Sequence, residues 1–436
     1  MNFIKKSLNV AQRIGQTANV AAKTGLHLAR GEKMSPQLLR QSFEQLGTTY
    51  IKIGQFIAST PSLFPREYVE AFQGCLDQTT PLPYDYIEGV LRAELESDGQ
   101  TLDDIFASID KTPLASASIA QVHAAVLKNG DKVVLKVQKP DVATTIDTDL
   151  GVLYGASKLL EALTPSLKFA SLAPIIDEIR LRMLAETNFI EEAQNIDEFQ
   201  EFLQRTDNQR VVAPRVYHEL STQKVLIMQR LYGVSMIDET AMRRYCANPA
   251  DVMATTLNTW FASLMLCNSF HADLHAGNLM LLEDGRIGFI DFGIVGRLKP
   301  EAWQACVGMM TSFAAEDYRG MAKHMIEMGM THEAIAVDVD TLAADLRRVM
   351  KQILAEDSLF IGKTIDQHDP TQLKDHAEEI NQMLLEMVEV GKRHGIHFPR
   401  DFALLTKQML YFDRFMKVLA PEMDMFQDAR IQMTQR

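Results

Sequence analysis

Two short runs with the composition of β-strands follow a long segment with helical spacing. Residues 119–126 and 132–137 are rich in Val and Ala, and Asn129-Gly130 lies between them. An Asn-Gly pair between two such runs is a strong signal for a β-hairpin, because both residues tolerate the positive φ angles of a tight turn. Residues 35–105 have helical spacing instead. The sequence therefore predicts an α+β chain with a small β-rich part.

Helices and a second hairpin are predicted on the C-terminal side of the first one. We expect one long helix that begins at Ser171 as N-cap and carries both Glu186 and Glu192. The other expected elements are helical sequence over 141–204 and from Asp238 onward, strands near 211–218 and 224–229, and a hairpin over 279–292 turned by Asp284-Gly285.

These patterns divide the 436 residues into four segments. The segments are a basic amphipathic leader over 1–33, a helical extension over 34–110, a small β-rich lobe with a helical insertion over 111–230, and a large helical lobe over 231–436. Ligands of two-lobed chains commonly bind in the cleft between the lobes.

Composition narrows the class of protein. The chain has 57 acidic and 44 basic residues and a net charge of −13, which disfavours a nucleic-acid-binding protein. Its four cysteines are scattered without a CxxC pair, which is typical of free thiols in a reducing compartment. Because the sequence has no run of about 18 apolar residues, we expect a soluble or peripheral protein.

The leader differs from the rest because it has no acidic residue before Glu32. It could lie on an anionic membrane surface, serve as a mitochondrial presequence, or pack as a helix on the body of the protein. Its basic residues are Lys5, Lys6, Arg13, Lys23 and Arg30.

Lys136 is flanked by apolar residues in the second predicted strand, Val133-Val134-Leu135-Lys136-Val137. An ammonium group among inward-facing side chains needs an anionic partner. Alternatively, the lysine lies on an edge strand and extends to water.

The residues around the second hairpin indicate phosphoryl transfer. Asn278 follows Asp273 by five residues, and Asp291-Phe292-Gly293 begins thirteen residues after Asn278. This is the spacing of phosphoryl-transfer enzymes of the protein-kinase type. Asn278 and Asp291 would supply oxygen ligands for Mg²⁺, and Asp273 would orient or deprotonate the attacking group. Lys136 would neutralise nucleotide phosphates and would need a glutamate partner.

The loop that should cover the phosphates has no glycine. It reads Ala115-Ser116-Ala117-Ser118, and alanine resists the positive φ angles that glycine adopts freely. We expect a stiffer loop in which the two serine hydroxyls are possible donors to phosphate.

Two other interpretations use the side chains of cysteine, histidine and methionine. Cys267, His271 and His275 recur every four residues and, with Asp273, could bind zinc if the segment were helical. The abundant methionines fill an irregular core or line a lipid-binding groove.

Three motifs together resemble a known family. Lys52-Ile53-Gly54-Gln55 is similar to a KxGQ signature, and the Ala-rich loop 115–123 and the HxDxHxGN loop 271–278 match as well. Over about residues 35–300 the chain resembles the UbiB-type atypical kinases, the AarF and ADCK group, which are linked to isoprenoid quinone biosynthesis.

The resemblance implies a protein-kinase-like bilobal fold whose KxGQ helices, with Lys52 and Gln55, cover the cleft. It implies ATP or ADP with Mg²⁺ as cofactors and ATP hydrolysis rather than ordinary protein kinase activity. By resemblance Glu192 pairs with Lys136, and Glu186 begins an ExD motif that contacts KxGQ.

The sequence departs from the family at Asn188, where the family has Asp; asparagine lacks the charge to pair with Lys52 or hold a second metal. A second departure is Gln229 in the hinge-like segment Met228-Gln229-Arg230, where adenine would contact the backbone.

Two functions remain open on these residues. One is an Mg²⁺-dependent atypical kinase or ATPase that supports isoprenoid quinone biosynthesis or handles its lipid precursors. The other is a nucleotide-binding, non-catalytic scaffold for quinone-biosynthetic enzymes. The expected location is the cytoplasm, at the inner face of the membrane, or alternatively the mitochondrial matrix.

Overall fold

The computed structural model describes residues 35–59, 66–72, 81–97, 99–163, 172–236, 239–267, 269–275, 277–331, 337–355 and, with short gaps, 386–431. The expected leader over 1–33 and the expected N-cap Ser171 lie outside the described residues. The chain forms two compact units. The first unit is Met1–Gln194 with Arg215–Arg230, and the second is Asn195–Pro214 with Leu231–Arg436.

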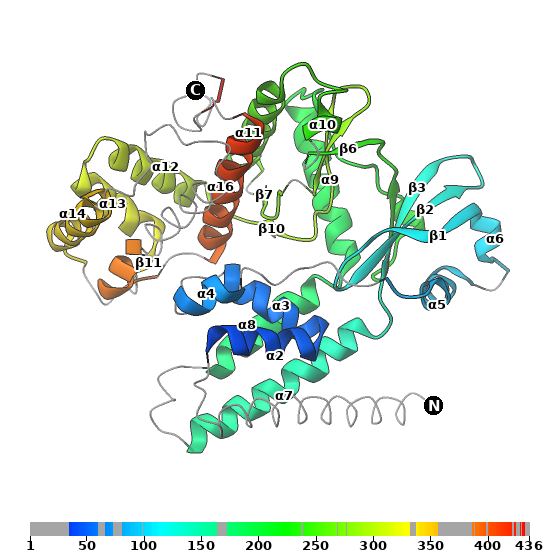
Figure 1. Ribbon diagram of the computed structural model, residues 1–436, viewed down its shortest axis with the longest axis horizontal. Coiled ribbons are helices and arrows are strands. Elements are labelled where there is room, and N and C mark those ends of the chain that lie inside the picture. The colour runs from blue at the N-terminus through cyan, green and yellow to red at the C-terminus, as the bar shows by residue number, and fades with distance from the viewer. Residues whose placement is uncertain are drawn as a thin grey trace. The chain divides into compact units, whose positions relative to one another are not determined.

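The first unit is built on a four-stranded antiparallel sheet in the order β1-β2-β3-β5 (Figure 1). The predicted hairpin is confirmed as β2 and β3, and Gly130 adopts a φ of 90° in its turn. Val133, Leu135 and Val137 on β3 are fully buried and belong to the core of this sheet. The strands are β1 (Phe106–Ser116), β2 (Ala120–Leu127), β3 (Lys132–Gln138) and β5 (Val225–Gln229).

Strand β1 was not predicted, and it includes Ala115 and Ser116 of the expected Ala-rich loop. Most of its residues are exposed, so it shows no alternation of apolar and polar side chains. Its register with β2 shifts at three places, including both sides of Pro113, which has no N–H to donate. Pairing with β2 rather than burial makes this edge segment a strand.

Helices account for the rest of the first unit. Figure 1 shows α2, α3 and α4 close to α7 and α8, and α3 contacts both α7 and α8. Ser35 caps α2 through a bond from the Leu38 N–H to its hydroxyl, at 3.2 Å. The helices are α2 (Pro36–Leu46), α3 (Thr48–Ser59), α4 (Arg66–Phe72), α5 (Tyr84–Leu95), α6 (Leu102–Ile105), α7 (Val142–Leu163) and α8 (Leu172–Ala185), with the 3-10 turn η2 (His218–Leu220).

The expected single helix carrying Glu186 and Glu192 is wrong. It is divided at 186–188 into α8 and a second helix, α9 (Phe189–Arg205), which continues into the second unit. The side chain of Asn188 accepts a hydrogen bond from the Ile190 N–H at 3.3 Å and therefore acts as an N-cap. Asparagine competes with helical bonding in this way, so the helical pattern does not run through it.

The second unit is mainly helical and contains the other predicted hairpin, β8 and β9, with Gly285 at a φ of 83° in the turn. Its sheets are β4-β9-β8-β6, β10-β7 and β11-β12. The strands are β4 (Val211–Val212), β6 (Gly233–Ser235), β7 (Phe270–His271), β8 (Leu279–Leu282), β9 (Ile287–Phe289), β10 (Val295–Gly296), β11 (Met330–Thr331) and β12 (Ile396–His397). The helices are α10 (Glu239–Met242), α11 (Pro249–Leu266), α12 (Pro300–Ala314), α13 (Tyr318–Met328), α14 (Val339–Ala355) and α16 (Arg400–Leu419).

The strand expected near 211–218 is much shorter than predicted. Only Val211 and Val212 form β4, which pairs parallel with β9, and Val216 makes an isolated bridge to Met228. Pro214 lies between these two pieces and cannot donate a hydrogen bond to a sheet, so the strand is interrupted there.

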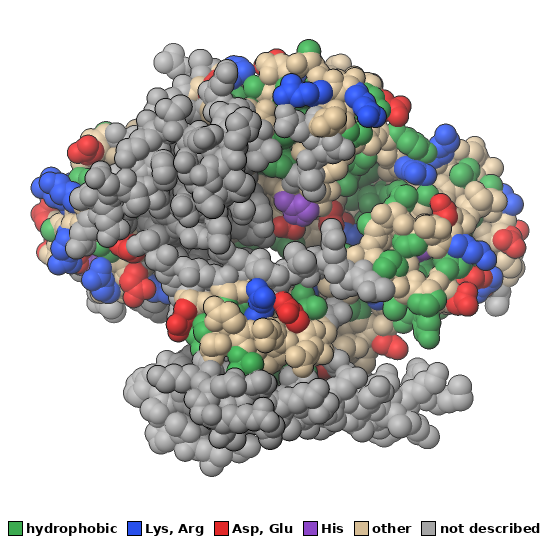
Figure 2. Space-filling model, viewed as in Figure 1, with side chains coloured by type: hydrophobic (Ala, Val, Ile, Leu, Met, Phe, Trp, Pro, Cys, Tyr) green, Lys and Arg blue, Asp and Glu red, His purple; other side chains and the backbone are tan. Residues whose placement is uncertain are grey.

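The surface carries mixed charge on the face shown in Figure 2, where Lys and Arg side chains are interspersed with Asp and Glu over the described residues. None of the helices among the described residues has the length and apolar content required to span a bilayer.

We predict that Gly296→Ala destabilises the second unit. A Cβ at this position would lie 2.3 Å from the ring of Phe270, which is buried and packs on Trp260. The expected loss is about 1–3 kcal/mol, measured by chemical denaturation. As a control, Gly89→Ala in α5 meets no atom within 4 Å and should stabilise the protein by about 0.5–1 kcal/mol. Equal effects of the two changes would contradict this account.

Candidate functional site

Lys136 lies on a central strand of the first unit. It pairs with Val122 of β2 and Leu226 of β5, so the alternative of an edge-strand lysine is wrong. Its Nζ donates to both carboxylate oxygens of Glu192, at 2.7 and 2.9 Å. The two side chains are only 10% and 3% exposed. The partner expected from the family resemblance is therefore present.

The start of α9 positions Glu192 for this bond. Asn188 caps the helix and also donates through its Nδ2 to the Glu191 carboxylate, at 3.0 Å. An aspartate at 188 would accept the capping bond but would repel Glu191. The departure from the family pattern at Asn188 thus has a local structural role.

A second bond connects the same strand to the same turn. Gln138 follows Lys136 by two residues on β3, is 3% exposed and donates to the Thr187 carbonyl at 2.8 Å. Residues two apart on a strand share a face, and this spacing was a signal that the sequence analysis did not use.

Lys52 of the KxGQ helix α3 contacts Glu186, as the resemblance implies. Its Nζ lies 2.5 Å from Glu186 Oε2, with side chains 12% and 22% exposed. Gln55 lies on the same helix. Tyr50, Ile53 and Ile57 form the buried face of α3, which holds Lys52 in place.

The Ala-rich segment forms a tight connection between β1 and β2. Ala115 and Ser116 belong to β1, and the Ala117 N–H donates to the Ala120 carbonyl at 2.9 Å. None of residues 115–118, all of which the structure describes, has a positive φ, as expected for a loop without glycine. Ser116 is partly exposed, whereas Ser118 is 1% exposed.

Strand β2 carries two buried polar side chains that bond to neighbouring backbone and that the sequence did not indicate as site residues. Gln121 accepts from the Leu82 N–H at 2.9 Å and donates to the Leu82 carbonyl at 3.2 Å. His123 Nδ1 lies 2.8 Å from the Asp110 carbonyl. Both side chains are fully buried, so these bonds restrict the strand that follows the Ala-rich turn.

In the second unit, the β8–β9 hairpin brings Asn278 and Asp291 to the same end. The Ile290 N–H donates to the Asn278 carbonyl at 3.0 Å, and Asp291 is the next residue. Asn278 Nδ2 donates to the Asp273 carbonyl at 2.9 Å, so its amide is oriented by the loop that carries Asp273. Asp291 has a φ of 61°, a left-handed backbone conformation that aspartate adopts more often than most non-glycine residues.

The buried His271 side chain forms hydrogen bonds with the backbone of the same loop. Its Nδ1 accepts from the Asp273 N–H at 3.3 Å, and its Nε2 lies 3.3 Å from the Ile290 carbonyl. These partners assign the proton to Nε2. Burial lowers the pKa of His271, so the ring is neutral near pH 7.

The zinc interpretation is not supported by this geometry. Both ring nitrogens of His271 face backbone groups, and Cys267 lies beside Arg205, whose Nη2 is 3.8 Å from Cys267 Sγ. Among the residues that the structure describes, no three His, Cys, Asp or Glu side chains form a group that could hold a metal.

The segment Asp291-Phe292-Gly293 is supported from α9 and from aromatic contacts. Asn195 Nδ2 donates to the Phe292 carbonyl at 3.1 Å. Phe199 lies 5.2 Å from the ring centroids of both Phe289 and Phe292. All of these residues belong to the second unit, and this packing restricts the backbone beside Asp291.

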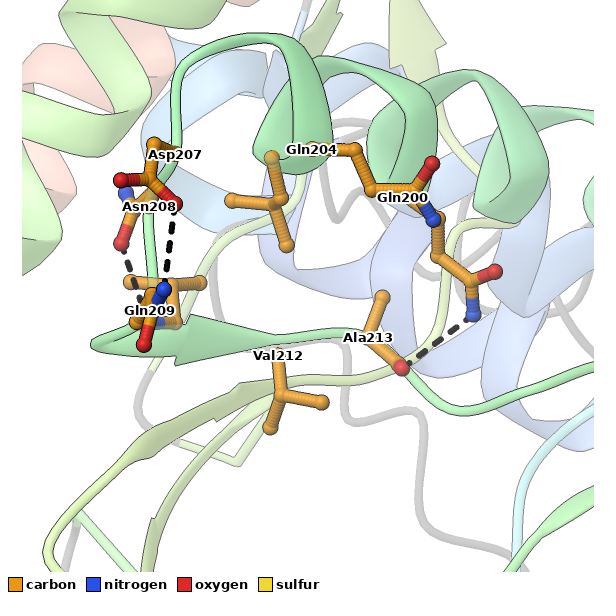
Figure 3. Close-up of a pocket in the computed structure, with 9 residues that line it drawn as sticks. Gln200, Gln204, Asp207, Asn208, Gln209, Val212 and Ala213 are labelled. Atoms are coloured by element: carbon orange, nitrogen blue, oxygen red, sulfur yellow. Dashed lines mark hydrogen bonds between the residues drawn. The ribbon is translucent and has the colours of Figure 1, made fainter.

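A hollow of about 350 Å³ lies between the end of α9 and β4 (Figure 3). It contains no predicted site residue. Gln200 donates to the carbonyls of Ala213 and Pro214, and Gln209 donates to Asp207, so these side chains bind the protein itself.

Together these features define a protein-kinase-like fold: an α+β chain with a small β-rich part and a large helical part, as predicted. A family model of the ABC1 atypical kinase-like domain matches residues 75–325. The chain belongs to this family of UbiB-type, AarF-type and ADCK-type proteins.

Individual relatives agree with this assignment. An uncharacterised chloroplastic aarF domain-containing protein kinase of Arabidopsis thaliana is 44% identical over 406 residues, covering 91% of this chain and 74% of that protein. A probable protein kinase UbiB of Aeromonas hydrophila is 28% identical over 399 residues, covering 90% and 68%. A Mycobacterium tuberculosis protein solved in complex with erythromycin has the same fold, with a TM-score of 0.54, 23% identity and coverage of 84% and 87%.

We predict that Lys136→Met destabilises the protein by roughly 3–5 kcal/mol, because it leaves the Glu192 carboxylate buried without its partner. The double change Lys136→Met and Glu192→Leu should recover most of this loss, as measured by chemical denaturation. The control Arg286→Ala removes an exposed partner of Asp284 and should cost less than about 1 kcal/mol. A double variant no more stable than Lys136→Met would contradict a buried, coupled pair.

Proposed function

We propose that this protein is an atypical kinase or ATPase that binds a magnesium nucleotide, ATP or ADP. The buried ion pair of Lys136 with Glu192 carries the proposal, because the pair fixes an ammonium group where the β-rich unit would hold phosphates. We assign the adenine contact to the backbone at Met228 on β5, and the phosphate contacts to residues 115–118.

Asn278 and Asp291 are the proposed magnesium ligands. A carboxamide and a carboxylate at one end of a hairpin are hard oxygen donors of the kind Mg²⁺ accepts. Because Asn278 Nδ2 is bonded to the Asp273 carbonyl, its amide presents Oδ1 as the ligand atom. The ion, when bound, would neutralise negative charge on phosphate oxygens.

Asp273 is the proposed residue that orients or deprotonates the attacking group, which is water or a hydroxyl. The neutral His271 holds the Asp273 backbone N–H, and the amide of Asn278 holds its carbonyl. These bonds fix the Asp273 backbone before a substrate arrives, which reduces the cost of positioning it. We assign Lys52, Gln55, Glu186 and Asn188 a regulatory role, supported by the Lys52–Glu186 ion pair.

The proposed biological setting is isoprenoid quinone biosynthesis or the handling of its lipid precursors. It is supported by the family and by relatives named as probable UbiB protein kinases. Contact with quinone-biosynthetic enzymes, and peripheral membrane contact through the basic leader, belong to the same proposal.

The test is Mg²⁺-dependent phosphate release from ATP, with and without detergent and a phenolic lipid mimic. Asp291→Asn should reduce turnover at least about 100-fold, because it removes a charged group that stabilises the transition state. The control Asp284→Asn, in the exposed turn of the same hairpin, should leave turnover within about 2-fold. Nucleotide binding without turnover in the wild type would contradict the proposed enzymatic activity and favour a nucleotide-binding scaffold.

A second prediction concerns the Ala-rich loop. Ala117→Gly should loosen the β1–β2 connection and change the ratio of ATP to ADP affinity by about 3-fold or more. Calorimetric titration of both nucleotides measures this ratio. Ala107→Gly, at an exposed position of the same strand, is the matched control. If neither affinity changes in Ala117→Gly, the loop does not set nucleotide preference.

A further inference from the structure

A buried glutamine on the C-terminal helix binds the loop that carries Asp273. Gln408 of α16 is 0% exposed. Its Oε1 accepts from the Leu274 N–H at 2.7 Å, and its Nε2 donates to the Leu274 carbonyl at 2.7 Å. Leu274 directly follows Asp273 in the chain and is itself 1% exposed. One side chain therefore satisfies both backbone groups of the residue next to the proposed catalytic aspartate.

The placement of this glutamine requires an explanation beyond packing. The other α16 side chains that the structure describes as buried are apolar: Phe402, Leu405, Phe412, Met416 and Leu419. Burial of a primary amide is costly unless it is hydrogen-bonded. Replacing Gln408 with an apolar residue would leave the Leu274 N–H and carbonyl without these partners in a buried environment. The Gln408 amide therefore bonds the loop, whereas the other buried side chains of α16 pack in the core.

The same helix supports the loop at a second point. Trp260 Nε1 donates to the His271 carbonyl at 2.9 Å. The ring of Phe412 on α16 packs edge-on against Trp260, with centroids 5.0 Å apart. Supports from α16 therefore act on both sides of Asp273, directly at Leu274 and through Trp260 at His271.

We propose that Gln408 is a positioning residue that holds Asp273 in its working geometry. This inference rests on the proposed function. The matched family region ends at residue 325, so the helix that would perform this task lies outside it. A shift of about 1 Å in a reacting group can cost about 100-fold in rate, and a bidentate bond to the neighbouring residue opposes such a shift.

The main test is Gln408→Met, which keeps the approximate shape of the side chain and removes both hydrogen bonds. We expect kcat for phosphate release to fall about 10- to 100-fold while KM for MgATP stays within about 3-fold, because the change affects the orientation of Asp273 and not nucleotide binding. Gln408→Glu keeps the acceptor for the Leu274 N–H, and its kcat should fall between those of wild type and Gln408→Met. Equal kcat values in all three proteins would overturn the proposal.

Met416→Ala is the matched control for stability. Met416 is 2% exposed and lies two turns further along α16, so its truncation removes core packing without touching Leu274. We expect it to lower the melting temperature at least as much as Gln408→Met while leaving kcat per folded molecule within about 2-fold. A comparable loss of kcat in Met416→Ala would reduce Gln408 to a general contributor to folding.

Amide hydrogen exchange separates this inference from the proposed function, because it needs no turnover. The Leu274 amide should exchange at least about 10-fold faster in Gln408→Met than in Met416→Ala. If the wild type hydrolyses no ATP, the proposed function fails, and this exchange still tests the bond to the loop. Unchanged protection of Leu274 in Gln408→Met would show that the glutamine does not hold the loop.

Discussion

The buried ion pair between Lys136 and Glu192 connects α9 to the central strand β3 of the first unit. An ammonium group on a central strand is stable only if a carboxylate reaches it, so α9 must begin at a defined point beside β3. The cap at Asn188 sets where α9 starts. Gln138 on β3 donates to the Thr187 carbonyl in the turn just before α9. Replacing such a pair by apolar residues is often neutral or stabilising, so the presence of the pair is weak evidence for a role in stability.

In the second unit, neutral side chains hold the loop that carries Asp273. Asp273 and Asp291 lie in irregular backbone beside the β8–β9 hairpin, and Asn278 lies at its end. Side-chain amides, a neutral histidine and the Trp260 indole bind the carbonyls and N–H groups of this loop. Neutral partners add little charge to a site proposed to bind a cation and phosphates. These buried side chains therefore support the loop that carries Asp273.

Short-range chemistry made part of this structure predictable from the sequence. Both hairpins were found because Asn129-Gly130 and Asp284-Gly285 specify their own turns. The break between α8 and α9 was missed because Asn188 acts through its side chain, which a periodicity argument does not detect. Gln408 was missed because its partner lies 134 positions away in the chain, and a polar residue in a helix normally predicts an exposed face. Of the candidate site, the pairing of Lys136 with Glu192 came from family resemblance, since no local pattern specifies it.

The central claim is that the Lys136 ammonium, held by Glu192, receives the phosphates of a magnesium nucleotide. Isothermal titration of the wild-type protein with ATP, in the presence of Mg²⁺ and in the presence of EDTA, tests it most directly when paired with the variant Glu192→Gln. We predict saturable binding that requires Mg²⁺ and is weakened at least about 10-fold in Glu192→Gln, about 1.4 kcal/mol. Binding of equal strength in both proteins, or no binding to folded wild-type protein, would contradict the account.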